Sequence, residues 1–180
     1  MKDSLLIFNF KNKLVNKVKM NDNNSNIIKL KSSDGKIFEI EENCLKRANF
    51  FKELNNILNP DEEINIKDVK SNTLIKIIEY LKHYQNEEPK EIPKPLPSPD
   101  LKPILNEWDY NYISPISIKD AIDLVNAADH LGIEKLVNLV SAKLSSEMTN
   151  CSLEEARAKF GIVPEMTEEE VAEYENYPLD

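Results

Sequence analysis

The sequence predicts an α+β fold, in which a small sheet near the N-terminus is followed by a longer series of helices. Two short apolar stretches surround Asp34-Gly35, a dipeptide that strongly favours a hairpin because glycine readily takes a positive φ angle. A third strand is predicted at residues 64–66, Ile-Asn-Ile. The helices are indicated by apolar residues at three- and four-residue spacing, most clearly in residues 115–144.

The elements between the hairpin and residue 84 follow from the same signals. Residues 43–58 predict one or two helical segments that end before Pro60, because proline cannot continue a helix. The next helix is predicted over residues 72–84, with Ser71 as its N-cap. The candidate core residues of these segments are Leu45, Phe50, Phe51, Leu54, Ile57, Leu74, Ile77, Ile78 and Leu81.

A proline-rich acidic loop is predicted at residues 87–104, which contain six of the ten prolines. This density of proline is incompatible with a helix or a central strand, so we expect an extended, mobile loop. A role as a PxxP ligand for an aromatic groove is the less favoured alternative. Trp108 follows, and we expect it to anchor the chain back onto the core.

Residues 115–144 predict two helices joined by a tight turn, around which the rest of the chain is expected to pack. Ser117 is the candidate N-cap of the first helix, and Gly132 and Ile133 are expected to end it in a Schellman motif. The second helix is apolar on more than one side, which predicts contacts with its own domain and with a later segment or another protein. The apolar residues are Ile118, Ala121, Ile122, Val125 and Ala128 in the first helix, and Leu136, Val137, Leu139, Val140 and Leu144 in the second.

The C-terminal region predicts two further helices. Ser152 is expected to cap a helix that ends at Gly161, and Thr167 to cap a last short helix over residues 168–177. The region is acidic, but it contains apolar side chains that must be buried against the body of the protein or a partner, which argues against a free, solvated tail. These residues are Leu153, Ala156, Phe160, Ile162, Val163 and Met166.

The net charge and the cysteine content exclude some classes of binding partner and of structural site. The net charge of −9 argues against nucleic acid and against an anionic membrane, because phosphate groups are bound by basic surfaces. Cys44 and Cys151 lie far apart without a CxxC motif, so a reducing compartment fits better than a disulfide framework or a zinc site. Residues 1–26 carry five lysines against two aspartates, a local charge of +3, and are interpreted as a disordered extension or an upstream start before Met20.

The sequence contains no recognisable catalytic or metal-ligating constellation. His83 and His130 are isolated on different predicted helices. The sequence contains only three glycines, too few and too far apart to form a glycine-rich phosphate-binding loop. The paired carboxylates stand in charge runs that are typical of solvated faces. Cys44 lies beside Lys46 and Arg47 but has no histidine near it. We therefore expect a binding protein without a cofactor and without catalysis.

Three separated motifs allow a comparison with known families. They are IIKLKSSDGKIFEI (27–40), AADHLGIEKL (127–136) and LEEARAKFGIVPEMTEEE (153–170), with Trp108-Asp109 after the proline-bearing loop. In this order they resemble the S-phase kinase-associated protein family, the adaptor subunits of SCF ubiquitin ligases. The resemblance implies a BTB/POZ fold over residues 27–149, followed by two F-box-binding helices within residues 150–180. It also implies an adaptor in cytoplasm and nucleus, which links the N-terminal domain of a cullin to F-box receptors for ubiquitin-dependent degradation and forms a weak homodimer when unliganded.

By position, the resemblance implies two binding surfaces. The cullin surface would use Asp129 and His130, where the family has Asn-Tyr. Two alternatives stay open: an F-box binder that has lost the cullin, and an elongin C-like or oligomerising BTB module, which would end near Leu144. The F-box surface would consist of Val137, Ser141, Leu144, Arg157, Phe160, Ile162, Val163 and Met166.

Overall fold

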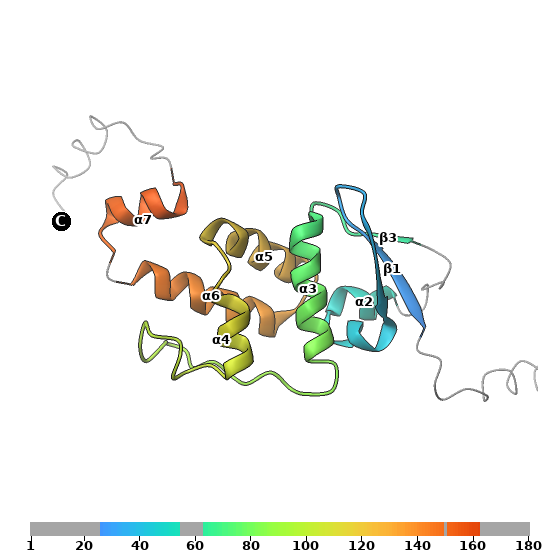
Figure 1. Cartoon of the computed structure of the whole chain (residues 1–180), viewed down its shortest axis with the longest axis horizontal. Coiled ribbons are helices and arrows are strands. Elements are labelled where there is room, and N and C mark those ends of the chain that lie inside the picture. The colour runs from blue at the N-terminus through green and yellow to red at the C-terminus, as the bar shows by residue number, and fades with distance from the viewer. Residues whose placement is uncertain (1–25, 55–62, 150, 163–180) are drawn as a thin grey trace, which may run out of the picture.

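The computed structural model describes residues 26–54, 63–149 and 151–162, and it places a three-stranded sheet at one end of a helical body (Figure 1). No helix in these ranges is long and apolar enough to cross a membrane. The elements are β1 (Ile27–Lys31), β2 (Ile37–Glu41), η1 (Glu42–Arg47), α2 (Asn49–Leu54), β3 (Glu63–Asn65), α3 (Ser71–His83), α4 (Glu107–Ile113), α5 (Ile118–His130), α6 (Glu134–Met148) and α7 (Leu153–Phe160).

The sheet has the strand order β2-β1-β3 and contains the predicted hairpin. β1 and β2 pair antiparallel, with Ile28 opposite Ile40 and Leu30 opposite Phe38, so that alternate side chains form one apolar inner face. Gly35 has φ of +83° in the connecting turn, as the Asp-Gly signal predicts. The third strand is also confirmed, but it runs parallel to β1, a relation that its three residues alone could not indicate.

The start of α3 differs from the prediction. Ser71 is the first helical residue, and the preceding Lys70 makes no side-chain cap. Instead, the carboxylate of Asp34 in the hairpin turn accepts hydrogen bonds from the backbone N–H of Ser71 at 2.8 Å and from its hydroxyl at 2.6 Å. The hydroxyl bond is the main reason that the pKa of Asp34 lies well below its ordinary value. A residue 37 positions earlier therefore caps the helix and ties the hairpin to the body.

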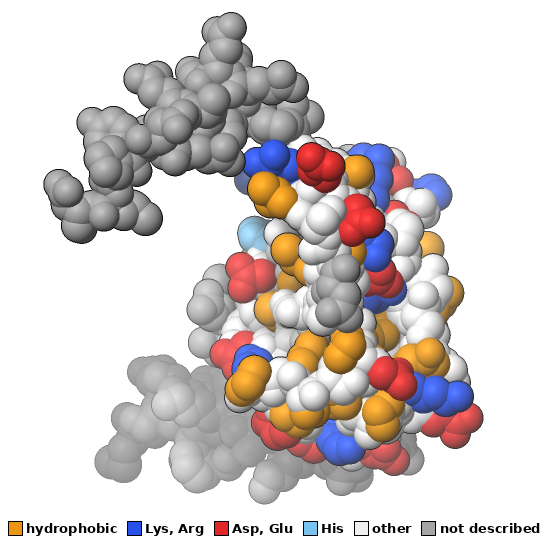
Figure 2. All heavy atoms as spheres, turned by 90° about the vertical axis from the view of Figure 1, so that its left-hand side faces the viewer, with side chains coloured by type: hydrophobic (Ala, Val, Ile, Leu, Met, Phe, Trp, Pro, Cys, Tyr) orange, Lys and Arg blue, Asp and Glu red, His pale blue; other side chains and the backbone are white. Residues whose placement is uncertain are grey.

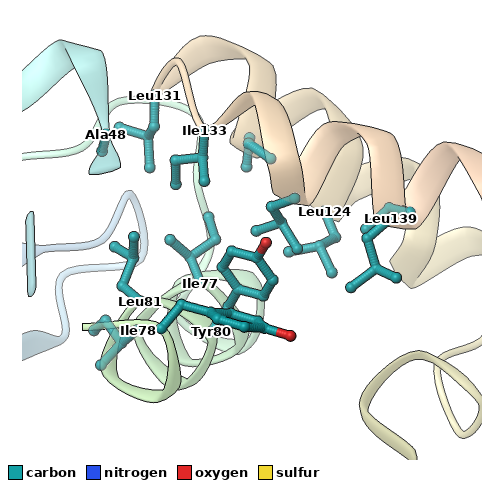
Figure 3. Close-up of a cluster of buried hydrophobic side chains, with 14 of the residues drawn as sticks. Ala48, Ile77, Ile78, Tyr80, Leu81, Leu124, Leu131, Ile133 and Leu139 are labelled. Atoms are coloured by element: carbon teal, nitrogen blue, oxygen red, sulfur yellow. The ribbon is translucent and has the colours of Figure 1, made fainter. Parts of the chain in front are cut away.

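The core lies between α3 and the α5–α6 pair (Figure 3). All four predicted core residues of α3 are buried, and the side chain of Tyr80 joins them. On α5 the buried face is centred on Ala121, Leu124 and Ala128, whereas the predicted Ile122 and Val125 are only half-buried. In the region after the hairpin, Leu45 and Phe51 are buried and Phe50 is half-buried, while the predicted Leu54 and Ile57 side chains lie outside the described residues.

The turn between α5 and α6 is the predicted Schellman motif. The N–H of Ile133 donates to the carbonyl of Ala128 at 2.8 Å, and the N–H of Gly132 donates to that of Asp129 at 2.9 Å. Gly132 has the left-handed φ of +65° that this ending requires. The beginning of α2 packs on this turn, because the N–H of Asn49 donates to the Gly132 carbonyl at 3.3 Å.

The proline-rich loop is extended, as predicted, but it lies against the body. We call residues 87–101 the strap, since they run along α6 before the chain returns to α4 (Figure 1). Pro89 and Leu101 are buried at its two ends, and Ile92 and Leu96 between them pack partly on the core. The prediction of a mobile loop did not foresee these contacts.

Trp108 anchors the chain after the strap, as expected. Its ring stacks on His83, with ring centres 3.7 Å apart, and on Tyr112 at 4.9 Å on α4. Beside it, the buried carboxylate of Asp109 accepts hydrogen bonds from the hydroxyl of Tyr84 and the side-chain amide of Asn106, both at 2.8 Å. Burial is the main cause that raises the pKa of Asp109 above its ordinary value.

Candidate functional site

The first candidate surface is the open face of α6, which we define as Val137, Ser141, Leu144 and Met148. These positions recur at three- and four-residue spacing and therefore share one side of the helix. Val137 and Leu144 are half-buried, whereas Ser141 and Met148 are exposed. The opposite side of α6 carries its buried residues, which are Leu136, Leu139, Val140, Ala142 and Lys143. The sequence prediction of a helix with two apolar sides is thus confirmed.

The second part of this surface is α7, which the chain forms from local signals. Ser152 accepts a hydrogen bond from the N–H of Glu155, and the carboxylate of Glu155 accepts one from the N–H of Ser152, which completes a capping box. Gly161 ends the helix with φ of +66°. None of the eight residues of α7 is buried. The helix therefore adds no fully buried side chain to the core, although it contacts α5 and the end of α6.

A small ionic cluster connects α7 to the end of α6. The ammonium group of Lys159 lies 2.8 Å from the carboxylate of Glu147 and donates to its backbone carbonyl at 3.0 Å. Lys143 reaches the same carboxylate at 3.3 Å from the preceding turn of α6. The bond from Lys159 is the main cause that lowers the pKa of Glu147, and the pKa of Lys159 is correspondingly raised. We call these three residues the corner cluster.

The structure places the predicted F-box residues in two groups. Val137, Ser141 and Leu144 lie together on α6, while Arg157 and Phe160 lie half-buried on α7 and Ile162 is exposed just after it. Val163 and Met166 lie outside the described residues, as does the helix predicted after Thr167. Figure 2 looks onto this end of the molecule and shows hydrophobic side chains among acidic and basic ones.

Sequence reasoning missed two contributors to this surface. Met148 is 50% exposed and continues the open face by one turn. Its four-residue spacing from Leu144 was the available signal. Leu153 is 66% exposed at the start of α7; the sequence identified it as apolar but did not include it in the binding surface.

The second candidate surface lies at the C-terminal end of α5. Asp129 and His130 are both exposed there, and the His130 ring lies 5.9 Å from the ring of Phe50 on α2. His130 also borders a hollow of about 370 Å³ between α5 and the segment that leads into α3. The lining side chains are Lys67, Asp68, Val69, Lys70, Thr73, Asp123, Asn126, Ala127 and His130. Among the described residues, no cluster of three or more histidine, cysteine or acidic side chains is arranged to hold a metal ion.

Comparison with known proteins places both regions in one family. The model of the Skp1 family tetramerisation domain matches residues 26–86, and that of the Skp1 family dimerisation domain matches residues 134–176. The S-phase kinase-associated protein 1 homolog of Tetrahymena thermophila is 30% identical over 152 residues, which cover 84% of this chain and 92% of that protein. SKP1-like proteins 18 and 4 of Arabidopsis thaliana are 30% and 31% identical, over 83% of this chain and 92% of each relative. The chain therefore belongs to the Skp1 family, and its small sheet with packed helices is an α+β, BTB/POZ-like fold.

Proposed function

We propose that the chain is the adaptor subunit of an SCF-type ubiquitin ligase. In this role it holds an F-box receptor on the open face of α6 and on α7, and it holds the N-terminal domain of a cullin at the end of α5. It links the two without a reaction of its own, and the choice of substrate lies with the receptor. Membership in the Skp1 family supports this role, because the proteins of that family are adaptors.

The observation that carries the proposal is the concentration of exposed apolar side chains near α7. Six large hydrophobic side chains are exposed among the described residues, and three of them, Met148, Leu153 and Ile162, lie within 15 residues of one another. Fully burying one such side chain against a partner contributes about 1.5–3 kcal/mol. An apolar helix of a receptor has the chemistry to cover this surface.

The receptor surface is tested by measuring the affinity of the full chain for an F-box domain encoded in the same genome, by isothermal titration calorimetry. We expect Leu144→Asp and Ile162→Asp each to weaken binding by at least about tenfold, since each places a charge in an apolar interface. Ile37→Asp is the matched control, because Ile37 is 48% exposed, close to the 54% of Ile162, but lies on the sheet. Equal affinity of all four proteins would contradict the proposal.

The cullin surface needs a separate test, because Asp129 and His130 replace the Asn-Tyr pair of the family. The exposed imidazole of His130 is smaller than a tyrosine ring, and Asp129 adds a negative charge. If the chain binds F-box receptors but has lost the cullin, the double variant Asp129→Asn, His130→Tyr should gain affinity for a cullin N-terminal domain. If the parent chain binds the cullin and the double variant binds it equally, these two positions do not determine the affinity.

We also propose that the adaptor works in cytoplasm and nucleus and that it self-associates weakly when no receptor is bound. The names of the two matched domains, tetramerisation and dimerisation, fit self-association. Sedimentation velocity at increasing concentration should show a dimer that an F-box domain dissociates. A dimer that persists at saturating F-box domain would place the self-association surface elsewhere.

A further inference from the structure

The strap follows one side of α6 over most of the length of the helix. Lys135 at the first turn of α6 pairs with Glu91, and Asn138 one turn later accepts a hydrogen bond from Lys94 at 2.7 Å. Towards the other end, the hydroxyl of Ser146 donates to the carbonyl of Pro99 at 2.6 Å. These contacts align the strap with the helix, so that it forms a continuous border beside α6.

This border adjoins the open face of α6. Asn138 directly follows Val137, and it lies three residues before Ser141, a spacing at which helix side chains are neighbours. Lys94 donates to Asn138 and therefore lies beside the surface proposed for the receptor. A partner that covers Val137 and Ser141 and extends past Asn138 would meet the strap next.

The charge of Lys94 is not neutralised within the described part of the chain. Its ammonium group donates to a neutral amide, and none of the ion pairs among the described residues includes it. Lys135 on α6 differs, because its charge is paired with Glu91, while Lys90 in the strap donates to the backbone carbonyl of Ile104 at 3.2 Å. Lys94 thus presents an exposed positive charge with free donors at the edge of an apolar surface.

We propose that the strap is a second wall of the receptor-binding surface and that Lys94 selects F-box receptors with a carboxylate facing it. This inference rests on the proposed function, because it extends the surface on α6 and α7. The apolar face supplies affinity that F-box receptors share, whereas the strap discriminates between them by charge. The proline-rich segment is thereby part of the binding site and not only a connection between α3 and α4.

The test measures the affinity of the full chain for a panel of F-box domains from the same genome. Lys94→Glu should weaken binding by about three- to tenfold for at least one domain, Lys94→Met should weaken it less, and the loss should shrink at 1 M salt, where charges are screened. Lys36→Glu is the matched control, because Lys36 is an exposed lysine in the hairpin turn, at the other end of the molecule (Figure 1). For the most affected domain, replacing its acidic residue opposite Lys94 by lysine should restore binding to Lys94→Glu.

The outcomes separate this inference from the proposed function. If Lys94→Glu binds every domain as Lys36→Glu does, while Leu144→Asp still weakens binding by at least about tenfold, the strap is not part of the site and the receptor surface stands. If the losses at Lys94 do not change with salt, the selection is not electrostatic and the inference is overturned. If neither Lys94→Glu nor Leu144→Asp affects binding, the receptor surface itself is wrong.

Discussion

Replacing Gly132 with alanine should destabilise the fold by more than the cost of placing alanine in a left-handed backbone conformation, because the added methyl group also meets Asn49. Gly132 has φ of +65°, and holding an L-residue in this left-handed region costs about 1–2 kcal/mol. In addition, a methyl group at this position would lie 2.8 Å from the Cβ atom of Asn49. That atom is next to the backbone and cannot rotate away, so the start of α2 must shift, and overpacking of this kind costs about 1–3 kcal/mol.

The two contributions together predict a loss of about 2–5 kcal/mol in the free energy of unfolding. For a chain of this size the loss corresponds to a decrease in Tm of about 4–20 °C. Urea unfolding followed by circular dichroism measures it. Gly35→Ala is the control, because Gly35 has φ of +83° but nothing lies within 4 Å of the added methyl group. We expect that variant to lose only the conformational part, about 1–2 kcal/mol.

A second variant isolates the contact. Asn49→Gly removes the Cβ atom that the new methyl group meets, so Gly132→Ala should cost less in the Asn49→Gly background than in the parent chain. If Gly132→Ala costs no more than Gly35→Ala, or if the Asn49→Gly background does not reduce its cost, the close packing of α2 on the α5–α6 turn does not constrain residue 132.

Three further predictions concern charges and caps. In the corner cluster, Glu147→Lys and Lys159→Glu should each weaken F-box binding by a few fold. The double variant should restore most of the affinity, because it re-forms the ion pair in the reverse orientation. If the double variant does not recover, the ion pair does not position α7 for the receptor. The pKa of Asp109 is raised in the folded state, so the folded protein binds the proton of this carboxyl group more tightly than the unfolded chain does. The resulting stabilisation is complete below the ordinary pKa of 3.8 and is lost as pH rises through the higher pKa of the folded state. Asp109→Asn should therefore flatten the decline of unfolding free energy above about pH 4, and an unchanged slope would refute this. Ser152→Ala should destabilise α7 by about 1 kcal/mol and increase amide exchange in α7 but not in α5. Equal effects on both helices would refute a purely local role of this cap.

The sequence predicted best those features that depend on a few neighbouring residues. The Asp34-Gly35 turn, the cap at Ser117, the ending at Gly132 and the cap at Ser152 each need only local geometry, and all four are present. Periodicity likewise located the buried residues of α3. On α5 it was less successful, because Leu124 and the half-buried Ile122 are equally apolar and only the packing of α3 against the helix distinguishes them.

The features that the sequence could not predict depend on distant partners. The cap of α3 comes from Asp34, so the local candidate Ser71 was a reasonable but wrong choice. The course of the strap depends on single contacts such as Lys94 with Asn138, which are 44 residues apart. Of the candidate site, the helices and their open sides were predictable, whereas the ion pairs that join α7 to α6 in the corner cluster were not, because no sequence motif indicates them.

The absence of buried side chains in α7 has an evolutionary consequence. A substitution in the core of this protein changes its stability and its function together, because each buried residue has several neighbours. An exposed side chain of α7, by contrast, can change with little effect on the stability of the body. After a gene duplication, we expect this helix to diverge earlier than α3 or α5, and two copies of the adaptor to acquire different receptors before their folds differ.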